Sequence, residues 1–149
     1  MRAPTRDRKS GLPLKSSRKI VSVVDDDIDI SKLFQTALSE NMEGITVASF
    51  NDPILALEHF NENKSEYVLV ISDLRMSGLN GLELLKRVKY SNSSVRTILM
   101  SGYNFDEIKS FQEYMELGII DSSIEKPVTI QRLCQRVRDE LETYGLANS

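Results

Sequence analysis

Acidic side chains follow two apolar segments of this 149-residue sequence. Aspartates 25–27 come directly after "KIVSVV" (residues 19–24), and Asp73 comes directly after "YVLVIS" (residues 67–72). Neighbouring carboxylates repel one another, so a cluster of them is stabilised by a cation. Mg²⁺ takes one or two carboxylates and keeps waters and phosphate oxygens as its other ligands. These aspartates therefore predict a magnesium site at which a carboxylate could attack phosphorus as a nucleophile.

Two further apolar segments end near groups that would assist phosphoryl transfer. Ser101 follows "VRTILM" (residues 95–100), and Lys126 comes soon after "GIIDSSI" (residues 118–124). The transition state of phosphoryl transfer spreads negative charge over the equatorial oxygens, which cations and hydrogen-bond donors stabilise. The Lys126 ammonium and the Ser101 hydroxyl could supply these two kinds of partner.

Strand-like and helix-like segments alternate five times along the chain. Several strand-like segments are near-continuous apolar runs, which are typical of parallel strands covered on both faces. Between them, apolar residues recur with the helical period, for example over residues 30–38 and 130–141. With right-handed crossovers, this pattern predicts an α/β fold, a five-stranded parallel sheet of order 2-1-3-4-5 doubly wound with five helices into a flavodoxin-like three-layer sandwich. The strands are expected at residues 19–24, 45–50, 67–72, 95–100 and 118–124.

Residues that cap helices mark several of the expected helix starts. Asp52 precedes Pro53, which suits an N-cap followed by proline at the first helical position. Asparagine with glutamate three residues later, at residues 80–83 and 104–107, is close to the capping-box pattern. We expect Asp27 to face solvent or cap a helix rather than bind the metal.

The expected fold gathers the chemical groups at one edge of the sheet. In open parallel sheets, ligands bind beyond the carboxyl ends of the strands, at the point where the strand order reverses. Neighbouring strands lie about 4.8 Å apart. Asp25, Asp26, Asp73, Ser101 and Lys126 should therefore lie within roughly 15 Å of one another.

The composition suits one globular domain in a reducing compartment. Hydrophobic residues make up 40% and charged residues 28% of the chain, enough to build an apolar core. A basic and disordered leader is expected over residues 1–17, the domain over 18–145, and a short tail over 146–149. The single cysteine, Cys134, lies on an apolar helical stripe and is expected to be buried. His59 is expected on a helix, without a role in the chemistry.

Four segments together resemble the receiver domain of two-component response regulators. They read "VVDDD", "VISDLRMSGLNGLEL", "TILMSG" and "EKPV", and the resemblance covers about residues 18–145. It implies a regulatory phosphoacceptor domain rather than an enzyme, in which Asp73 takes a phosphoryl group from a histidine kinase or a histidine phosphotransfer protein. It also implies the other site residues. Asp25, Asp26, Asp73 and the Arg75 backbone carbonyl would hold Mg²⁺, and Ser101 and Lys126 would contact the phosphoryl oxygens.

The stretch before Lys126 departs from the family pattern. Ser123 stands three residues before the lysine, where the family usually has a tyrosine or phenylalanine that swings inward on activation. The spacing from Gly118 to Lys126 is also one residue longer than the common pattern. Either Tyr103 replaces the missing ring, or the loop after Ser101 carries the signal alone. The family commonly has a cis peptide bond at the proline that follows the lysine.

The resemblance implies that a contact with an unknown output protein carries the signal, in the cytoplasm. No nucleic-acid-binding domain is expected, and no apolar stretch approaches the roughly 18–20 residues of a membrane span.

A haloacid-dehalogenase-type phosphatase is one alternative function, but it needs further acidic ligands after the lysine strand and does not need Asp73. A flavodoxin-like flavin binder is another, although three aspartates would repel the flavin phosphate. A third is a receiver-like scaffold that is never phosphorylated.

Overall fold

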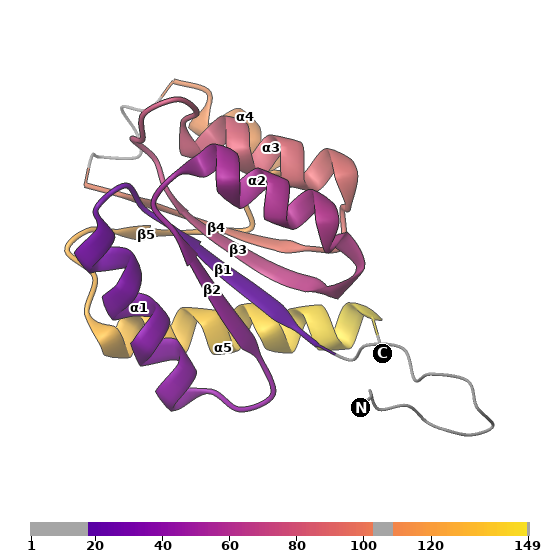
Figure 1. The fold of residues 1–149 in the computed structure, drawn as a ribbon. Coiled ribbons are helices and arrows are strands. Elements are labelled where there is room, and N and C mark those ends of the chain that lie inside the picture. The colour runs from indigo at the N-terminus through magenta and orange to yellow at the C-terminus, as the bar shows by residue number, and fades with distance from the viewer. Residues whose placement is uncertain (1–17, 103–108, 149) are drawn as a thin grey trace.

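The computed structural model describes residues 18–102 and 109–148, and of residues 146–148 the backbone alone. In this part of the chain, strands and helices alternate as predicted (Figure 1). The strands are β1 (Ile20–Val24), β2 (Thr46–Phe50), β3 (Tyr67–Asp73), β4 (Arg96–Ser101) and β5 (Ser122–Glu125). The helices are α1 (Ile28–Asn41), α2 (Pro53–Glu62), α3 (Gly81–Ser91), α4 (Phe111–Glu116) and α5 (Ile130–Asn148), with a 3-10 turn η1 at Lys64–Glu66.

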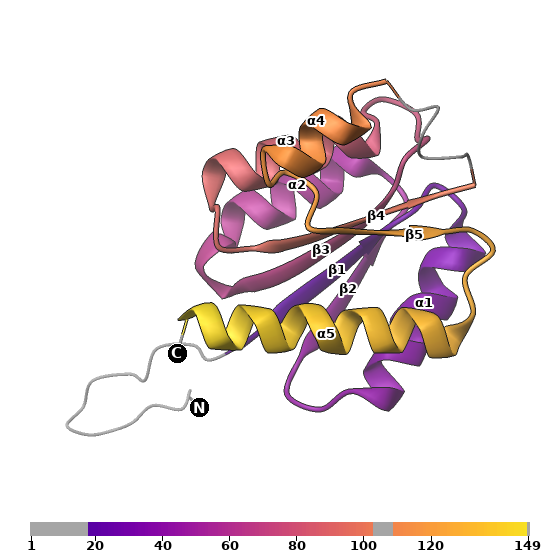
Figure 2. The same cartoon turned by 180° about the vertical axis from the view of Figure 1, so that it is seen from behind.

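The five strands form one parallel sheet between two layers of helices. The strand order is β2-β1-β3-β4-β5, which confirms the predicted topology. Helices α1 and α5 cover one face, and α2, α3 and α4 cover the other (Figures 1 and 2). The apolar core accordingly has two halves. One contains Phe60 of α2 and Leu84 of α3, and the other contains Phe34 of α1 and Leu133 of α5.

The central strands β1 and β3 are buried along their whole length. Helices on both faces of the sheet exclude water from every position, which explains the unbroken apolar runs in the sequence. The registers Val24↔Ser72 and Asp73↔Met100 align the carboxyl ends of β1, β3 and β4 at one level. Side chains just beyond these ends therefore meet at one edge of the sheet.

The predicted caps form where the structure describes them. The Asp27 carboxylate accepts hydrogen bonds from the Asp29 and Ile30 N–H groups at the start of α1. Asp52 caps α2 in the same way, and the Asn80 side chain accepts from the backbone N–H of Glu83 at the start of α3. Residues 104–107 lie outside the described part of the chain, so the cap predicted there is not tested. Within the described residues, α4 begins at Phe111.

The fifth strand is shorter than predicted and starts later. The sequence predicts residues 118–124, whereas β5 spans Ser122–Glu125. Gly118 adopts a left-handed conformation (φ 75°), which favours glycine and ends the preceding helix. The N–H groups of Ile119 and Ile120 then donate to the Tyr114 carbonyl oxygen, so both are committed to closing α4 and cannot pair with β4. The other strands differ from the prediction by one residue at one end or, in β4, at both ends.

The predicted placements of two single side chains are confirmed. Cys134 is buried. His59 is half-buried on α2, and its Nδ1 lies 2.7 Å from the Tyr67 hydroxyl oxygen. Within the described residues, no helix combines the length and the apolar character needed to cross a bilayer.

Candidate functional site

Three carboxylates meet at the carboxyl ends of β1 and β3. Asp25, Asp26 and Asp73 each offer an oxygen, and these oxygens lie within 4.8 Å of one another. Asp25 is only 1% exposed and Asp73 only 8%, while Asp26 faces solvent. Three hard oxygen donors so close together fit a divalent cation such as Mg²⁺. The structure thus brings together the three aspartates that the sequence predicts as metal ligands.

Local backbone contacts divide the consecutive aspartates between two roles. The Asp25 N–H donates to the carbonyl of Phe50 in β2, which ties the end of β1 to its neighbour. The Asp27 N–H donates to Asp25 Oδ1 at 3.0 Å, and the Asp27 side chain caps α1. Asp25 therefore points into the site and Asp27 does not, as the sequence predicts.

Gly81 allows the loop after Asp73 to close tightly. The Gly81 N–H donates to the Leu74 carbonyl at 2.8 Å, and a Cβ atom at residue 81 would collide with the backbone carbonyl of Asp73. Any larger residue would therefore have to displace the phosphoacceptor candidate. Sequence reasoning missed this requirement. The available signal was a glycine at the first position of a helix, where its low helix propensity needs another explanation.

Lys126 joins the two buried carboxylates. Its Nζ lies 3.0 Å from Asp73 Oδ1 and 3.1 Å from Asp25 Oδ2. Its backbone N–H donates to the Ser101 carbonyl at 2.8 Å, which anchors it at the end of β4. The peptide bond from Lys126 to Pro127 is cis, as the resemblance implies.

The charges of the site shift the pKa values of two groups. Burial raises the pKa of Asp73, the hydrogen bond from Lys126 opposes that rise, and the nearby Asp25 charge adds to it. Burial lowers the pKa of Lys126, but hydrogen bonds to Asp73 and Asp25 outweigh this effect and raise its pKa overall. The lysine therefore stays protonated at neutral pH. One ammonium against three carboxylates leaves excess negative charge, which a divalent cation would offset.

The remaining predicted residues lie near this cluster. Ser101 is the last residue of β4 and is 1% exposed. Arg75 lies in the loop after β3, and its side chain is exposed. Contact of the Ser101 hydroxyl with a phosphoryl group, and of the Arg75 carbonyl with a metal ion, stay predictions. Tyr103 lies outside the described residues.

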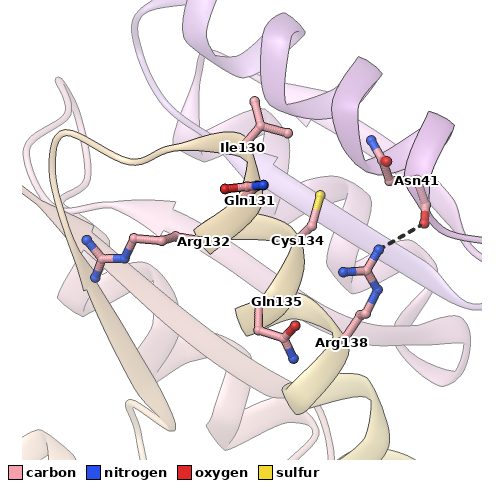
Figure 3. A pocket seen from close by; sticks show the side chains of 7 residues that line it. All are labelled: Asn41, Ile130, Gln131, Arg132, Cys134, Gln135 and Arg138. Atoms are coloured by element: carbon pink, nitrogen blue, oxygen red, sulfur yellow. Dashed lines mark hydrogen bonds between the residues drawn. The ribbon is translucent and has the colours of Figure 1, made fainter.

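A separate hollow of about 480 Å³ lies between α1 and α5 (Figure 3). The Arg138 guanidinium donates to the Asn41 carbonyl across it, at 3.5 Å. No acidic side chain of the described residues lines this hollow, and none of the predicted site residues does. Its lining residues are Asn41, Ile130, Gln131, Arg132, Cys134, Gln135 and Arg138.

Comparison with known proteins gives a consistent result. The family model of the response regulator receiver domain matches residues 21–138. The chain is 35% identical over 117 residues to a transcriptional regulatory protein, the CpxR homolog of Haemophilus influenzae. This match covers 78% of the chain but 47% of that relative, so the chain spans about half its length.

Two further comparisons span nearly whole proteins. Sporulation initiation phosphotransferase F of Bacillus subtilis is 29% identical over 124 residues, covering 83% of the chain and 91% of that protein. A crystal structure of a CheY-like response regulator receiver domain protein from Methanospirillum hungatei superimposes with a TM-score of 0.76. At 21% identity it covers 89% of this chain and all of that one, and supports the fold. The residues that the family model matches include β2 to β5, all of β1 but its first residue, and the three clustered aspartates, and on this evidence the chain belongs to the family of response regulator receiver domains.

Proposed function

We propose that Asp73 accepts a phosphoryl group from a phosphohistidine of a histidine kinase or a histidine phosphotransfer protein. The observation that carries this proposal is the Lys126 ammonium, which lies within 3.1 Å of both Asp73 and Asp25 at the ends of neighbouring strands. The loaded domain then changes its contacts with an output protein. Membership of the receiver family supports this signalling role.

The chemistry is a displacement at phosphorus. An oxygen of the Asp73 carboxylate attacks, the bond from phosphorus to that oxygen forms, and the bond to the donor histidine nitrogen breaks. The nitrogen keeps the electron pair and takes up a proton from water. The Lys126 ammonium offsets negative charge on the transferring group, and the Ser101 hydroxyl donates a hydrogen bond to one of its oxygens.

Asp25, Asp26 and Asp73 would hold Mg²⁺, with the Arg75 backbone carbonyl as a further ligand. When bound, the ion neutralises charge on the phosphoryl oxygens and so lets an anionic donor approach three carboxylates. Asp26 is the exposed member of the set and faces the side from which a donor must arrive. Asp25 is buried and held by the Asp27 N–H, which fixes its carboxylate before any ion binds.

An apolar groove beside the site supports a protein as the phosphoryl donor. It has a volume of about 440 Å³ and lies between α1 and the segment after β5. Leu33 is 51% exposed there and shares the groove with other apolar side chains, and exposed apolar surface of this kind marks sites of protein contact. Its lining residues are Ile30, Leu33, Phe34, Lys126, Pro127 and Val128.

We also propose that residues 18–145 form the receiver domain and that it acts in the cytoplasm. The family model, which covers residues 21–138, supports these bounds. The buried and unpaired Cys134 suits a reducing compartment.

Incubation with acetyl phosphate and Mg²⁺, followed by intact mass measurement, tests the proposal. We expect a gain of one phosphoryl group in the wild type and none without Mg²⁺. Steady release of phosphate from many phosphomonoesters would instead favour the phosphatase alternative. A wild type that gains no mass from acetyl phosphate or from a phosphohistidine protein would favour the scaffold alternative.

A further inference from the structure

The residues of the edge strand β5 do little to fix the register in which it pairs with β4. It has four residues and pairs with β4 on one side only. Ile124 is its one buried residue, and the neighbouring Ser122 and Ser123 provide no apolar alternation. A strand can slip by one residue where no strong pattern opposes the slip. A contact outside the strand must therefore fix the register.

Asp121, one residue before β5, makes such a contact with β4. Its Oδ2 accepts from the backbone N–H of Thr97 at 2.9 Å. Its own N–H donates to the Thr97 carbonyl at 3.1 Å and to Thr97 Oγ1 at 3.0 Å. The carboxylate thus accepts a hydrogen bond from strand β4 directly before the first pair of the ladder, Ile98↔Ser122.

Two basic side chains, one from helix α3 and one from strand β4, hold this carboxylate. Lys89 Nζ of α3 lies 2.7 Å from Asp121 Oδ2, and Arg96 lies 3.5 Å from the other oxygen. Arg96 also donates to Glu140 of α5 at 2.7 Å, and Glu140 accepts from the Ser122 hydroxyl at 2.7 Å. The side chains of Asp121 and Lys89 are 11% and 10% exposed, so water competes little for these bonds.

The register of β5 near Asp121 determines where Lys126 lies at the phosphoacceptor site. The ladder runs from Ile98↔Ser122 to Ser101↔Glu125 without a register shift, and Asp121 and Thr97 directly precede its first pair. The next residue is Lys126, whose N–H donates to the Ser101 carbonyl. A slip by one residue would move Lys126 about 3.3 Å along the strand direction and turn its side chain to the other face.

We propose that Asp121 is a positioning residue for the phosphoacceptor site, because its carboxylate fixes the register of β5 and thereby the reach of Lys126. This inference rests on the proposed function, in which Lys126 assists transfer to Asp73.

A double-mutant cycle tests whether Asp121 acts through Lys126. We would measure the rate of labelling by acetyl phosphate and Mg²⁺ in the wild type, Asp121→Ala, Lys126→Ala and the double variant. Asp121→Ala should slow labelling by about tenfold or more, as expected of a misplaced catalytic group. In the Lys126→Ala background it should change the rate by less than about twofold. An equal loss in both backgrounds would show a general effect on the fold and overturn the proposal.

Conservative variants separate an effect on the register of β5 from an effect on the stability of the fold. Asp121→Asn retains an oxygen that can accept from the Thr97 N–H but loses the charge paired with Lys89. It should label at nearly the wild-type rate although its melting temperature falls, and labelling as slow as in Asp121→Ala would contradict the register argument. Asp139→Ala, at an exposed acid of α5, is the matched control and should change neither quantity. If Asp121→Ala does not fold, Thr97→Val should show a smaller loss with the same dependence on Lys126.

The register itself can be read without phosphorylation. Cross-strand amide contacts between Ile98 and Ser122, observed by NMR in Asp121→Ala, should be lost or replaced by those of a shifted register. Their retention at wild-type intensity would refute the inference. Absence of labelling in the wild type, with the register altered in the variant, would count against the proposed function alone.

Discussion

Charged residues cluster at both ends of the parallel sheet, and the two clusters differ in their balance of acidic and basic groups. At the carboxyl ends, one ammonium faces three carboxylates, and Asp26 is exposed. At the amino ends, two acids pair with two bases, and the side chains of three of the four are 7–11% exposed. The members of this second cluster are Lys89, Arg96, Asp121 and Glu140.

The difference indicates which cluster has a partner outside the chain. Buried charges persist when the protein itself pairs them, and the second cluster meets that condition with its own side chains. The first cluster keeps excess negative charge around Asp73, whose raised pKa reflects burial and the neighbouring Asp25. A balanced cluster supports the fold, whereas an unbalanced one at an open edge fits a cation and a phosphoryl group.

The largest expected effect is the loss of phosphorylation in Asp73→Asn. This change keeps the shape of the side chain but removes the nucleophilic oxygen, so the gain of one phosphoryl group should disappear. Intact mass measurement after incubation with acetyl phosphate and Mg²⁺ checks it. Labelling at the wild-type level would show that another residue is the phosphoacceptor.

Asp26→Ala should remove the magnesium dependence while the fold survives. Outer-shell partners of a metal already cost about 10–100-fold in affinity when lost, and a direct ligand should cost at least as much. The measurement is a titration of labelling rate against Mg²⁺. Asp29→Ala, at an exposed acid in the first turn of the helix that follows Asp26, is a suitable control. An unchanged titration in Asp26→Ala would remove this residue from the metal site.

Glu140→Ala should destabilise the fold by about 3 kcal/mol, since it breaks a buried ion pair and leaves Arg96 less well paired. Glu83→Ala breaks an exposed pair with Arg87 and should cost less than about 0.5 kcal/mol. Urea unfolding of both variants in Mg²⁺-free buffer compares them directly. Equal losses would mean that burial does not distinguish the two pairs.

The smallest expected effect is a gain of stability in Asp73→Asn without Mg²⁺. Because the pKa of Asp73 is raised on folding, its protonated form favours the folded state, and this contribution is lost as pH rises through the folded pKa. Removing the charge at neutral pH should therefore raise the melting temperature by a few degrees. The difference between variant and wild type should shrink in acid, where Asp73 is already protonated. A lower melting temperature for the variant at neutral pH would reverse the sign that we infer.

Much of the candidate site was predictable because it depends on strand ends. The apolar runs before Asp25 and Asp73 identify both strands, and parallel order brings their ends together. The ion pairs of Lys126 were not predictable in detail, since they depend on a register set by Asp121. The role of Gly81 was also missed, because its close approach to the Asp73 carbonyl involves backbone that no periodicity reveals.

The sequence by itself determined the caps at Asp27, Asp52 and Asn80, because capping is a local property. It also determined the α/β class and the strand order, because alternating strand and helix periods with right-handed crossovers allow few topologies. Only the tertiary structure decided where β5 begins and which charges balance one another. Ile119 and Ile120 have the composition of a strand, yet their N–H groups bond to Tyr114 in α4. The packing of α4 against the sheet decides this competition, because it places the Tyr114 carbonyl within reach of both N–H groups. These two residues therefore cannot use their N–H groups to pair with β4.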